Sequence, residues 1–323
     1  MKKGIFCVFI VMCFISDALG SEPLKPLTIQ LDWFTNVQFA GILVAKEKGW
    51  YEEAGIDLNI KGWQKGISPV EEVVAGRAQI GTDEGTVIIE ARAGGKPIKA
   101  IGTQFQKSPL CLTSKKDRAI VSPKDLIGKK VGVSMPKTVL MTKIILASEN
   151  ITYDQITPVQ TGGDISLLAN DKVIAFAGFI NNQPLLMEEK GYPATYLAAF
   201  KYGYDFYSDV FFTTDEMIKN QPDILKKFMD VTLRGWREVF KNIPDTAQLV
   251  LDKYHPDRTA SLKQQIKSLE IFKNLMTMGV GEVLLGFMEE RNWKKGVDTL
   301  MKFGQIQNKI PATDIFTLEF LKK

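Results

Sequence analysis

An acidic and an aromatic side chain stand together where the first strand of the sequence gives way to a helix. Residues 27–31 alternate apolar and polar side chains, which predicts a half-buried strand. Asp32, Trp33 and Asn36 follow, ahead of a helix that ends at Gly49. A carboxylate accepts hydrogen bonds from N–H groups, and an indole offers a flat apolar face. The junction predicts a site for a small ring with N–H donors; a capping Asp and a core Trp are the ordinary alternative.

Further aromatic and acidic candidates follow the next predicted strands. In an open α/β fold, ligands bind beyond the carboxyl ends of the strands. Trp33, Phe39 and Trp63 could form an aromatic box, or one or two of them could belong to the core. Asp83 and Glu84 come after a short strand and face the same edge of the sheet. Their alternative role is to cap the next helix and complement its dipole.

A second group of candidates comes from the middle of the chain and is expected to face the first. A glycine pair and an acid open a predicted helix, whose N–H groups could hold a carboxylate, a phosphate or a ring carbonyl, or could form only a tight turn. An aromatic ring and an amide follow a buried strand, and a tyrosine belongs to an aromatic cluster that could line a hinge or pack the lobes together. These candidates are Gly162, Gly163, Asp164, Phe179, Asn182 and Tyr204.

The net charge and the single histidine bear on which classes of site are expected. The net charge of +4 argues neither for nor against a nucleic-acid partner. No basic cluster is interleaved with aromatic residues, so no nucleic-acid partner is expected. His255 is the one histidine, which is too few for a zinc site or a His-dependent triad. We therefore expect no metal, no cofactor and no catalytic residue.

The N-terminus has the pattern of a cleavable leader. Two lysines precede an apolar stretch at residues 5–15, and a small-x-small site follows at residues 18–20. Residues 1–20 are therefore predicted to be a signal peptide that directs the chain to the periplasm. Its removal leaves Cys111 as the one cysteine, so no internal disulfide is expected. No later stretch approaches the ~18 apolar residues that a spanning helix needs.

Strands and helices alternate in two successive sets, which predicts an α/β fold with parallel-rich sheets. The length exceeds what one core usually holds, so two lobes are expected. Residues 21–112 and 206–323 are assigned to lobe 1, which is discontinuous, and residues 113–205 to lobe 2. Two extended crossing segments then predict a hinge with a cleft between the lobes.

The motifs quoted above resemble a known family. Leu31-Asp32-Trp33, together with the stretches at 38–41, 44–51, 55–58, 76–81, 105–110, 122–133 and 235–236, is similar to the substrate-binding proteins of ABC transporters for thiamine-pyrimidine precursors. Relatives of that group bind sulfonates, taurine, nitrate or riboflavin-like compounds. The resemblance implies a type 2 periplasmic-binding-protein fold, with a ligand enclosed between two α/β lobes.

The resemblance also implies roles for individual residues. Trp33 would stack on a pyrimidine ring, Asp32 would receive its amino group, and Asn36 matches a nearby motif asparagine. The pattern departs from the family where Pro is replaced by Thr35, where His is replaced by Phe39, and where the acid after the residue matched by Asn182 is replaced by Gln183. Phe39 and Gln183 favour a ring system that is less cationic than the family's pyrimidines.

The resemblance implies a non-enzymatic receptor that captures a small heteroaromatic ligand by lobe closure. Its partners would be a membrane permease, touched peripherally, and the ATPase that drives it; the receptor itself is expected to be a monomer. One alternative is a ligand-sensing module for a membrane signalling partner. Another is an enzyme like the pyrimidine synthases that use pyridoxal phosphate, but this chain lacks their Cys-rich motif and has only His255, which the sequence places far from the opening loop.

Overall fold

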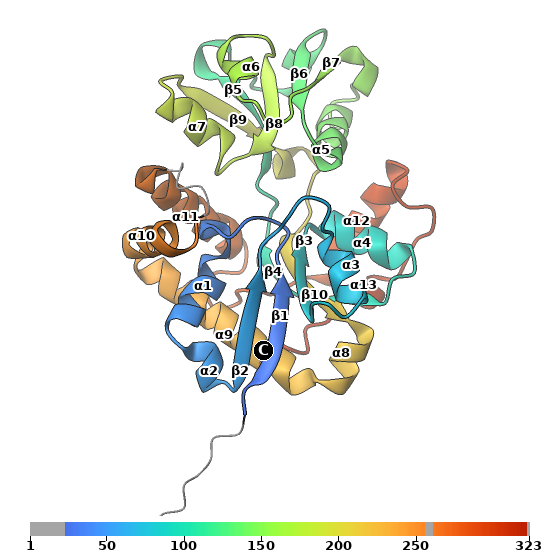
Figure 1. The fold of residues 1–323 in the computed structure, drawn as a ribbon. Coiled ribbons are helices and arrows are strands. Elements are labelled where there is room, and N and C mark those ends of the chain that lie inside the picture. The colour runs from blue at the N-terminus through green and yellow to red at the C-terminus, as the bar shows by residue number, and fades with distance from the viewer. Residues whose placement is uncertain (1–22, 256–260, 322–323) are drawn as a thin grey trace, which may run out of the picture.

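Two five-stranded sheets organise the part of the chain that the computed structural model describes, residues 23–255 and 261–321 (Figure 1). The strand order is β2-β1-β3-β10-β4 in the first sheet and β7-β6-β8-β5-β9 in the second. We call the first sheet with its helices lobe 1, and the second with its helices lobe 2. The predicted signal peptide, residues 1–20, lies outside the described residues.

The sheet of lobe 1 is parallel except for one strand. β1 pairs in parallel with β2 and β3, whereas β10 lies antiparallel between β3 and β4. Alternating apolar residues of β1 and β2 are buried, as the period-2 pattern of the sequence predicted. The strands are β1 (Lys25–Gln30), β2 (Ile56–Lys61), β3 (Ile80–Asp83), β4 (Ile98–Phe105) and β10 (Ser208–Thr214).

Lobe 2 repeats the same arrangement with β5 in the antiparallel place, between β8 and β9. Its strands are β5 (Leu110–Lys115), β6 (Lys130–Val133), β7 (Thr157–Gln160), β8 (Ala175–Phe179) and β9 (Ala194–Ala198). The sequence assigned residues up to 112 to lobe 1, but Leu110 already pairs with Phe179 of β8. The predicted connecting strand is thus a fully paired member of the second sheet, and each crossing segment delivers its sheet's antiparallel strand.

Helices cover both sheets, and several of them begin where the sequence predicted. Ser68 accepts a hydrogen bond from the backbone N–H of Glu71, and Pro69 takes the first helical position. The helices of lobe 1 are α1 (Ala40–Glu47), α2 (Trp50–Glu53), α3 (Pro69–Val74), α4 (Gly85–Ala93), α8 (Asp215–Asn220), α9 (Pro222–Lys241), α10 (Ile243–Lys253), α11 (Leu262–Thr277), α12 (Glu290–Lys302) and α13 (Ala312–Ile315). Those of lobe 2 are α5 (Pro136–Ala147), α6 (Ser166–Ala169) and α7 (Gln183–Glu189).

Short 3-10 turns complete the framework: η1 (Val37–Phe39), η2 (Lys116–Arg118), η3 (Pro123–Leu126), η4 (Tyr153–Gln155) and η5 (Ala199–Tyr202). None of the described helices combines the length and the apolar character that a membrane crossing would require.

Helix α1 is held against the long helix α9 by a glycine contact. A Cβ built on Gly235 would lie 2.0 Å from the carbonyl oxygen of Gly41, and a Cβ on Gly41 would lie 2.4 Å from the indole of Trp236. Only residues without a side chain permit backbones this close. Because the loop after β1 runs directly into η1 and α1, this contact fixes where that loop lies.

Two short segments carry the chain between the lobes, and they lie against one another. The backbone N–H of Ser108 donates to the carbonyl oxygen of Phe206 at 3.0 Å. Lys107 and Asp205 form an ion pair across the same pair of segments. The next residue after Phe206 is also held in place, since the Tyr207 hydroxyl accepts a hydrogen bond from the backbone N–H of Glu289 at 2.7 Å.

Candidate functional site

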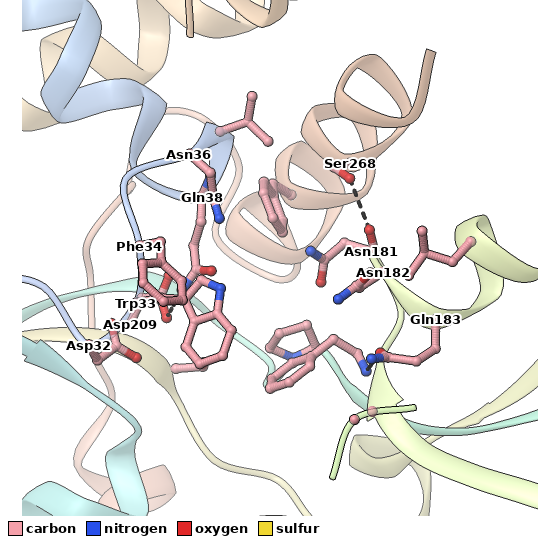
Figure 2. A pocket seen from close by; sticks show the side chains of 18 of the residues that line it. Asp32, Trp33, Phe34, Asn36, Gln38, Asn181, Asn182, Gln183, Asp209 and Ser268 are labelled. Carbon is pink, nitrogen blue, oxygen red and sulfur yellow. Dashed lines mark hydrogen bonds between the residues drawn. The ribbon is translucent and has the colours of Figure 1, made fainter. Parts of the chain in front are cut away.

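A cavity of about 590 Å³ is lined by residues of both lobes (Figure 2). Lobe 1 contributes the loop after β1, the start of β10 and one face of α11, whereas lobe 2 contributes the end of β8 and the residues that start α5 and α7. Cavities of ~300–1,000 Å³ are typical of small-molecule sites. This position beyond the strand ends is where the sequence placed its candidates.

Aromatic rings form the wall on the lobe 1 side. Trp33 and Phe34 line the cavity and are 37% and 41% exposed. Trp63 stacks behind Trp33, with ring centroids 5.7 Å apart, and Phe34 meets both indoles edge-on at 5.4 and 5.3 Å. Phe179, at the end of β8, lines the cavity from lobe 2. A planar ligand could therefore contact aromatic faces from both lobes.

Carboxyl groups gather beside this wall. Asp32 is oriented by Thr82, whose hydroxyl donates to Asp32 Oδ1 at 2.7 Å. Glu84 also lines the cavity; it is 2% exposed, and within residues 23–255 and 261–321 its Oε2 atom makes no hydrogen bond. Lys137, from the first turn of α5, brings a positive charge from lobe 2, with Nζ 3.9 Å from Glu84 Oε1. The cavity floor is therefore rich in acceptors.

Burial and neighbouring charges shift the pKa values of the carboxyl groups and the lysine in and beside the cavity. Burial, reinforced by the charge of Asp32, raises the pKa of Asp83 to about 8. Burial likewise raises the pKa of Glu84, and the charge of Lys137 opposes that rise. Burial alone would lower the pKa of Lys137, but the neighbouring carboxylates, Glu84 first, outweigh it and hold that pKa above its usual value. The Lys137 ammonium thus remains charged at neutral pH, whereas the Asp83 carboxyl group keeps its proton.

Asp209 anchors a network of amides at the start of β10. Its backbone is left-handed, with φ of 48°, and its side chain is buried. Asp209 Oδ1 accepts from Gln38 Nε2 at 3.1 Å, and Oδ2 accepts from Gln104 Nε2 at 2.9 Å. Burial raises the pKa of Asp209 well above its usual value, with Asp32 and Glu84 adding to the effect. The network fixes Gln38 at the cavity wall.

Helix α11 belongs to lobe 1 but also touches lobe 2. Gln264, Gln265, Ser268 and Phe272 on this helix line the cavity. The Ser268 hydroxyl donates to the carbonyl oxygen of Asn181 at 2.9 Å, as Figure 2 shows. Ion pairing between Lys267 and Glu188 and packing of Ile271 against Cys111, Ile180 and Ala198 extend the contact. The enclosure of the cavity therefore depends on this helix.

Most of the residues predicted from the sequence do meet at this cavity. The lining includes Asp32, Trp33, Asn36, Glu84, Gly162, Gly163, Phe179 and Asn182. The alternative role of Glu84 as a side-chain cap is not used, since α4 has no side-chain cap hydrogen bond. Asn36 does cap η1, because its Oδ1 accepts from the backbone N–H of Gln38 at 2.7 Å.

Other predicted residues lie away from the cavity lining. Phe39 is fully buried in the core of lobe 1, because η1 turns its ring inward, so the expected three-ring box contains Phe34 in its place. Trp63 is not among the lining residues; it packs against Trp33 and Phe34, which are. Tyr204 is fully buried and packs edge-on against Phe206.

The two remaining acids that the sequence proposed serve local structure. Asp83 Oδ1 accepts from the backbone N–H of Glu84 at 2.9 Å, and Asp83 does not line the cavity. Asp164 accepts from the backbone N–H and the hydroxyl of Ser166, at 2.9 and 2.8 Å, which is a turn rather than a ligand contact. Asp83 therefore does not line the cavity, and at Asp164 the structure has the tight turn that the sequence left open as the alternative.

The sequence reasoning missed several lining residues. His255 is one: it was expected far from the opening loop, yet it lines the cavity, and the neighbouring Tyr254 accepts a hydrogen bond from Thr35 through its carbonyl oxygen at 3.0 Å. Lys137 follows a strand and a helix-starting proline, so the strand-end rule could have found it. Gln183, which the sequence marked only as a departure from the family pattern, also lines the cavity. The others with polar side chains are Gln38, Ser134, Asn181, Ser208, Asp209, Gln264, Gln265 and Ser268.

Metal binding is not indicated by the described side chains. Within residues 23–255 and 261–321, His, Cys, Asp and Glu form no group of three or more that could hold a metal ion.

Proteins of known role align along most of the chain. The riboflavin-binding protein RibY of Chloroflexus aurantiacus is 25% identical, with 95% of this chain and 89% of that protein aligned. A formylaminopyrimidine-binding protein of Halalkalibacterium halodurans is 22% identical, covering 96% and 95%. A 4-amino-5-hydroxymethyl-2-methylpyrimidine phosphate synthase of Legionella pneumophila subsp. pneumophila is 27% identical, covering 74% and 77%.

Solved structures share the architecture. A putative sulfonate ABC transporter periplasmic sulfonate-binding protein, SsuA, of Methylobacillus flagellatus KT superposes with a TM-score of 0.70 at 16% identity, over 93% of both chains. This likeness, with the two sheets and two crossings, shows the type 2 periplasmic-binding-protein fold that the sequence predicted.

The sequence also matches a family description. Residues 36–247 fit the model described as NMT1/THI5 like, and this range holds the cavity residues from Asn36 to Asp209 together with all of lobe 2. The chain therefore belongs to the NMT1/THI5-like family.

Proposed function

We propose that this protein is an exported receptor that captures a small heteroaromatic solute between its lobes and presents it to an ABC permease. The observation that carries the proposal is the cavity itself, where the exposed faces of Trp33 and Phe34 stand beside the Asp32 and Glu84 carboxyl groups. An aromatic wall next to acceptors suits a planar ring with N–H groups.

The energetics favour such a ligand over a sulfonate or nitrate. An anion would lie beside the Asp32 and Glu84 carboxyl groups, and the positive charge of Lys137 is already balanced by Glu84. Aromatic pairs contribute about 0.5–1.5 kcal/mol beyond the apolar area that they bury. A ring between Trp33 and Phe179 would gain this on both faces, and the buried Glu84 Oε2 atom would gain a partner.

The named relatives are consistent with this ligand class. Riboflavin and formylaminopyrimidine, which two relatives are named for binding, are both nitrogen heteroaromatics. The cavity of about 590 Å³ is large enough for either class of ring. We propose a pyrimidine-precursor-like ligand, with the departure at Gln183, which lines the cavity, favouring a ring of low positive charge.

Export and transport complete the proposal. The predicted signal peptide at residues 1–20 would place the protein in the periplasm. There it would act as a monomer, closing on the ligand and touching the permease peripherally, while an ATPase on the other side of the membrane drives import. Delivery to a membrane sensor in place of a permease is the alternative fate of the same ligand-bound form.

Catalysis is the competing function, because one relative is named a synthase and His255 lies at the cavity wall. A receptor releases its ligand chemically unchanged, whereas a pyridoxal-dependent synthase would carry the absorbance of its cofactor. We propose that this protein is not an enzyme. Chromatography of ligand recovered after binding, with a visible absorption spectrum of the purified protein, separates the two functions.

The test is ligand-dependent thermal stabilisation of protein stripped by unfolding and refolding. Riboflavin, formylaminopyrimidine and an alkanesulfonate are compared at the same concentration. A ligand at 100 times its dissociation constant adds about 2.7 kcal/mol to the free energy of unfolding. We expect a rise in melting temperature with a heteroaromatic compound, lost in Trp33→Ala and retained in Trp50→Ala, whose ring lies outside the cavity. Stabilisation by the sulfonate alone would overturn the ring-binding site.

A further inference from the structure

The orientation of the Gln183 side chain is fixed by the end of strand β8. Gln183 Oε1 accepts from the backbone N–H of Phe179 at 2.6 Å. The amide also covers Gly178 closely, since a Cβ built there would lie 2.2 Å from Oε1. A backbone N–H requires an acceptor, so the amide oxygen and not its nitrogen must face the strand.

This orientation leaves the Gln183 NH₂ group for the cavity. Gln183 lines the cavity, and within the residues that the structure describes its Nε2 atom donates no hydrogen bond. Asn181 and Asn182 lie next to it on the same wall (Figure 2). Lys137 supplies a further donor from lobe 2. Gln183 and Lys137 therefore present hydrogen-bond donors from lobe 2.

Lobe 1, in contrast, offers mainly hydrogen-bond acceptors to the cavity. Gln38 Nε2 donates to Asp209, so the side-chain oxygen of Gln38 remains to accept a hydrogen bond from a ligand. Asp32 has one oxygen on Thr82 and a second to offer. Glu84 Oε2 is buried without a partner among the described residues. Asn36 is the exception, because its oxygen caps η1 and its NH₂ group remains.

We propose that the cleft recognises two edges of one ring: an N–H edge by acceptors of lobe 1, and a carbonyl or other acceptor edge by donors of lobe 2, with Gln183 as the residue that sets the second preference. This inference rests on the proposed function and narrows its ligand to a ring that carries both an amino group and a carbonyl. Such a ligand is also the one that joins the lobes, since each lobe binds a different edge.

The physical basis is the cost of an unpaired polar group in an enclosed site. A ring that lacks the carbonyl leaves the Gln183 amide without an acceptor after closure, and a ring that lacks the amino group leaves the Oε2 atom of Glu84 without a hydrogen bond. Sites built to hydrogen-bond a substrate group reject analogues that lack it far more strongly than apolar pockets reject a missing methylene.

The test uses three matched rings: cytosine, which has both groups, 4-aminopyrimidine, which lacks the carbonyl, and pyrimidin-2-one, which lacks the amino group. Dissociation constants are measured by titration calorimetry with the whole purified protein. We expect cytosine to bind at least tenfold more tightly than either of the others.

Two substitutions assign the carbonyl preference. Gln183→Glu keeps an oxygen for the Phe179 N–H and places a second oxygen where the donor was, and Gln183→Leu removes the donor without adding charge. Both are expected to weaken cytosine about tenfold and to leave 4-aminopyrimidine within threefold of the unsubstituted protein. Gln305→Glu, on an exposed residue outside the cavity, is the control for added charge.

The outcomes separate this inference from the proposed function. If the rings bind but cytosine has no advantage, or keeps its advantage in both Gln183 variants with unchanged melting temperatures, the two-edge recognition is overturned and the receptor stands. If none of the three rings binds while riboflavin or formylaminopyrimidine stabilises the protein, the inference again fails alone. If no heteroaromatic compound binds at all, both proposals fall.

Discussion

Ser268 of lobe 1 donates a hydrogen bond to the backbone oxygen of Asn181 in lobe 2, and this bond of 2.9 Å joins the two lobes beside the cavity. Asn182 and Gln183, the next residues along, line the same wall. A single side chain on α11 thus touches the segment that starts α7, and the surrounding contact includes the ion pair of Lys267 with Glu188. The lobes are held together beside the residues that would meet a ligand.

Removal of this hydrogen bond should speed ligand release. A typical hydrogen bond contributes about 0.5–1.5 kcal/mol, so Ser268→Ala should weaken binding roughly 2- to 12-fold, mainly through the dissociation rate. Stopped-flow tryptophan fluorescence measures that rate. Thr299→Ala is the matched control, because the Thr299 hydroxyl also donates to a backbone carbonyl oxygen, that of Lys295, but within its own helix and outside the cavity. Equal dissociation rates in both variants would contradict a role for Ser268 in holding the lobes together.

The stacked indoles should contribute unequally to binding. Trp33→Leu removes the ring that lines the cavity, so a loss in affinity of about tenfold or more is expected from lost stacking and buried area. Trp63→Leu removes only the support behind Trp33, so a smaller loss, about two- to threefold, is expected. Titration calorimetry measures both. A larger loss at Trp63 than at Trp33 would show that the ligand contacts the cavity in another way.

The glycine contact between α1 and α9 should be intolerant of a methyl group. Gly235→Ala places a Cβ 2.0 Å from the Gly41 carbonyl oxygen, and overpacking of this kind costs about 1–3 kcal/mol. Urea denaturation should show that loss in the free energy of unfolding. Gly62→Ala is the control, since the nearest atom to its Cβ would be 3.6 Å away. Equal stability of the two variants would mean that the helices separate without cost.

Stability should fall between weakly acidic and mildly alkaline pH because of the buried acids. Burial raises the pKa of Asp83 to about 8, whereas an unfolded Asp titrates near pH 4. Between these values the unfolded chain has released a proton that the folded protein keeps, so a rise in pH favours unfolding, and the effect is complete above pH 8. Glu84 and Asp209 act in the same direction, since their pKa values are also raised.

Asp83→Asn should reduce that slope, because the amide cannot ionise. The free energy of unfolding, measured by urea denaturation at several pH values from 5 to 8.5, gives the slope for each protein. Asp57→Asn, an exposed acid on β2, is the control and should retain the slope of the unsubstituted protein. An identical slope in Asp83→Asn would show that Asp83 is ionised throughout this range.

Local sequence patterns predicted most of the strands and helices, because apolar periodicity and end signals depend only on nearby residues. The strand predicted at residues 27–31 is β1, and the helix predicted to end at Gly49 is α1, after which Gly49 adopts a left-handed φ of 70°. The place of β10 between β3 and β4 was not predictable from these patterns. Pairing partners more than a hundred residues away leave no periodicity in the strand itself. Leu110 appeared to be a connection because its partner Phe179 belongs to a strand that comes much later in the sequence.

The site was predictable where its residues directly follow a strand. Asp32, Trp33 and Phe179 were found in this way, and they line the cavity. Phe39 was misplaced because the helical pattern hid a 3-10 turn that rotates its ring into the core. Asp209 was missed because its partners Gln38 and Gln104 are distant in sequence and its own surroundings look like an ordinary strand.

The shared strand order of the two sheets has a consequence for the order in which the lobes can form. All strands of the second sheet lie within residues 110–198, whereas the first sheet needs β10, residues 208–214, to fill the place between β3 and β4. A chain that emerges N-terminus first can complete its second sheet while its first still has a gap. The part of the protein that starts the sequence is therefore the last to close its hydrogen-bond ladder.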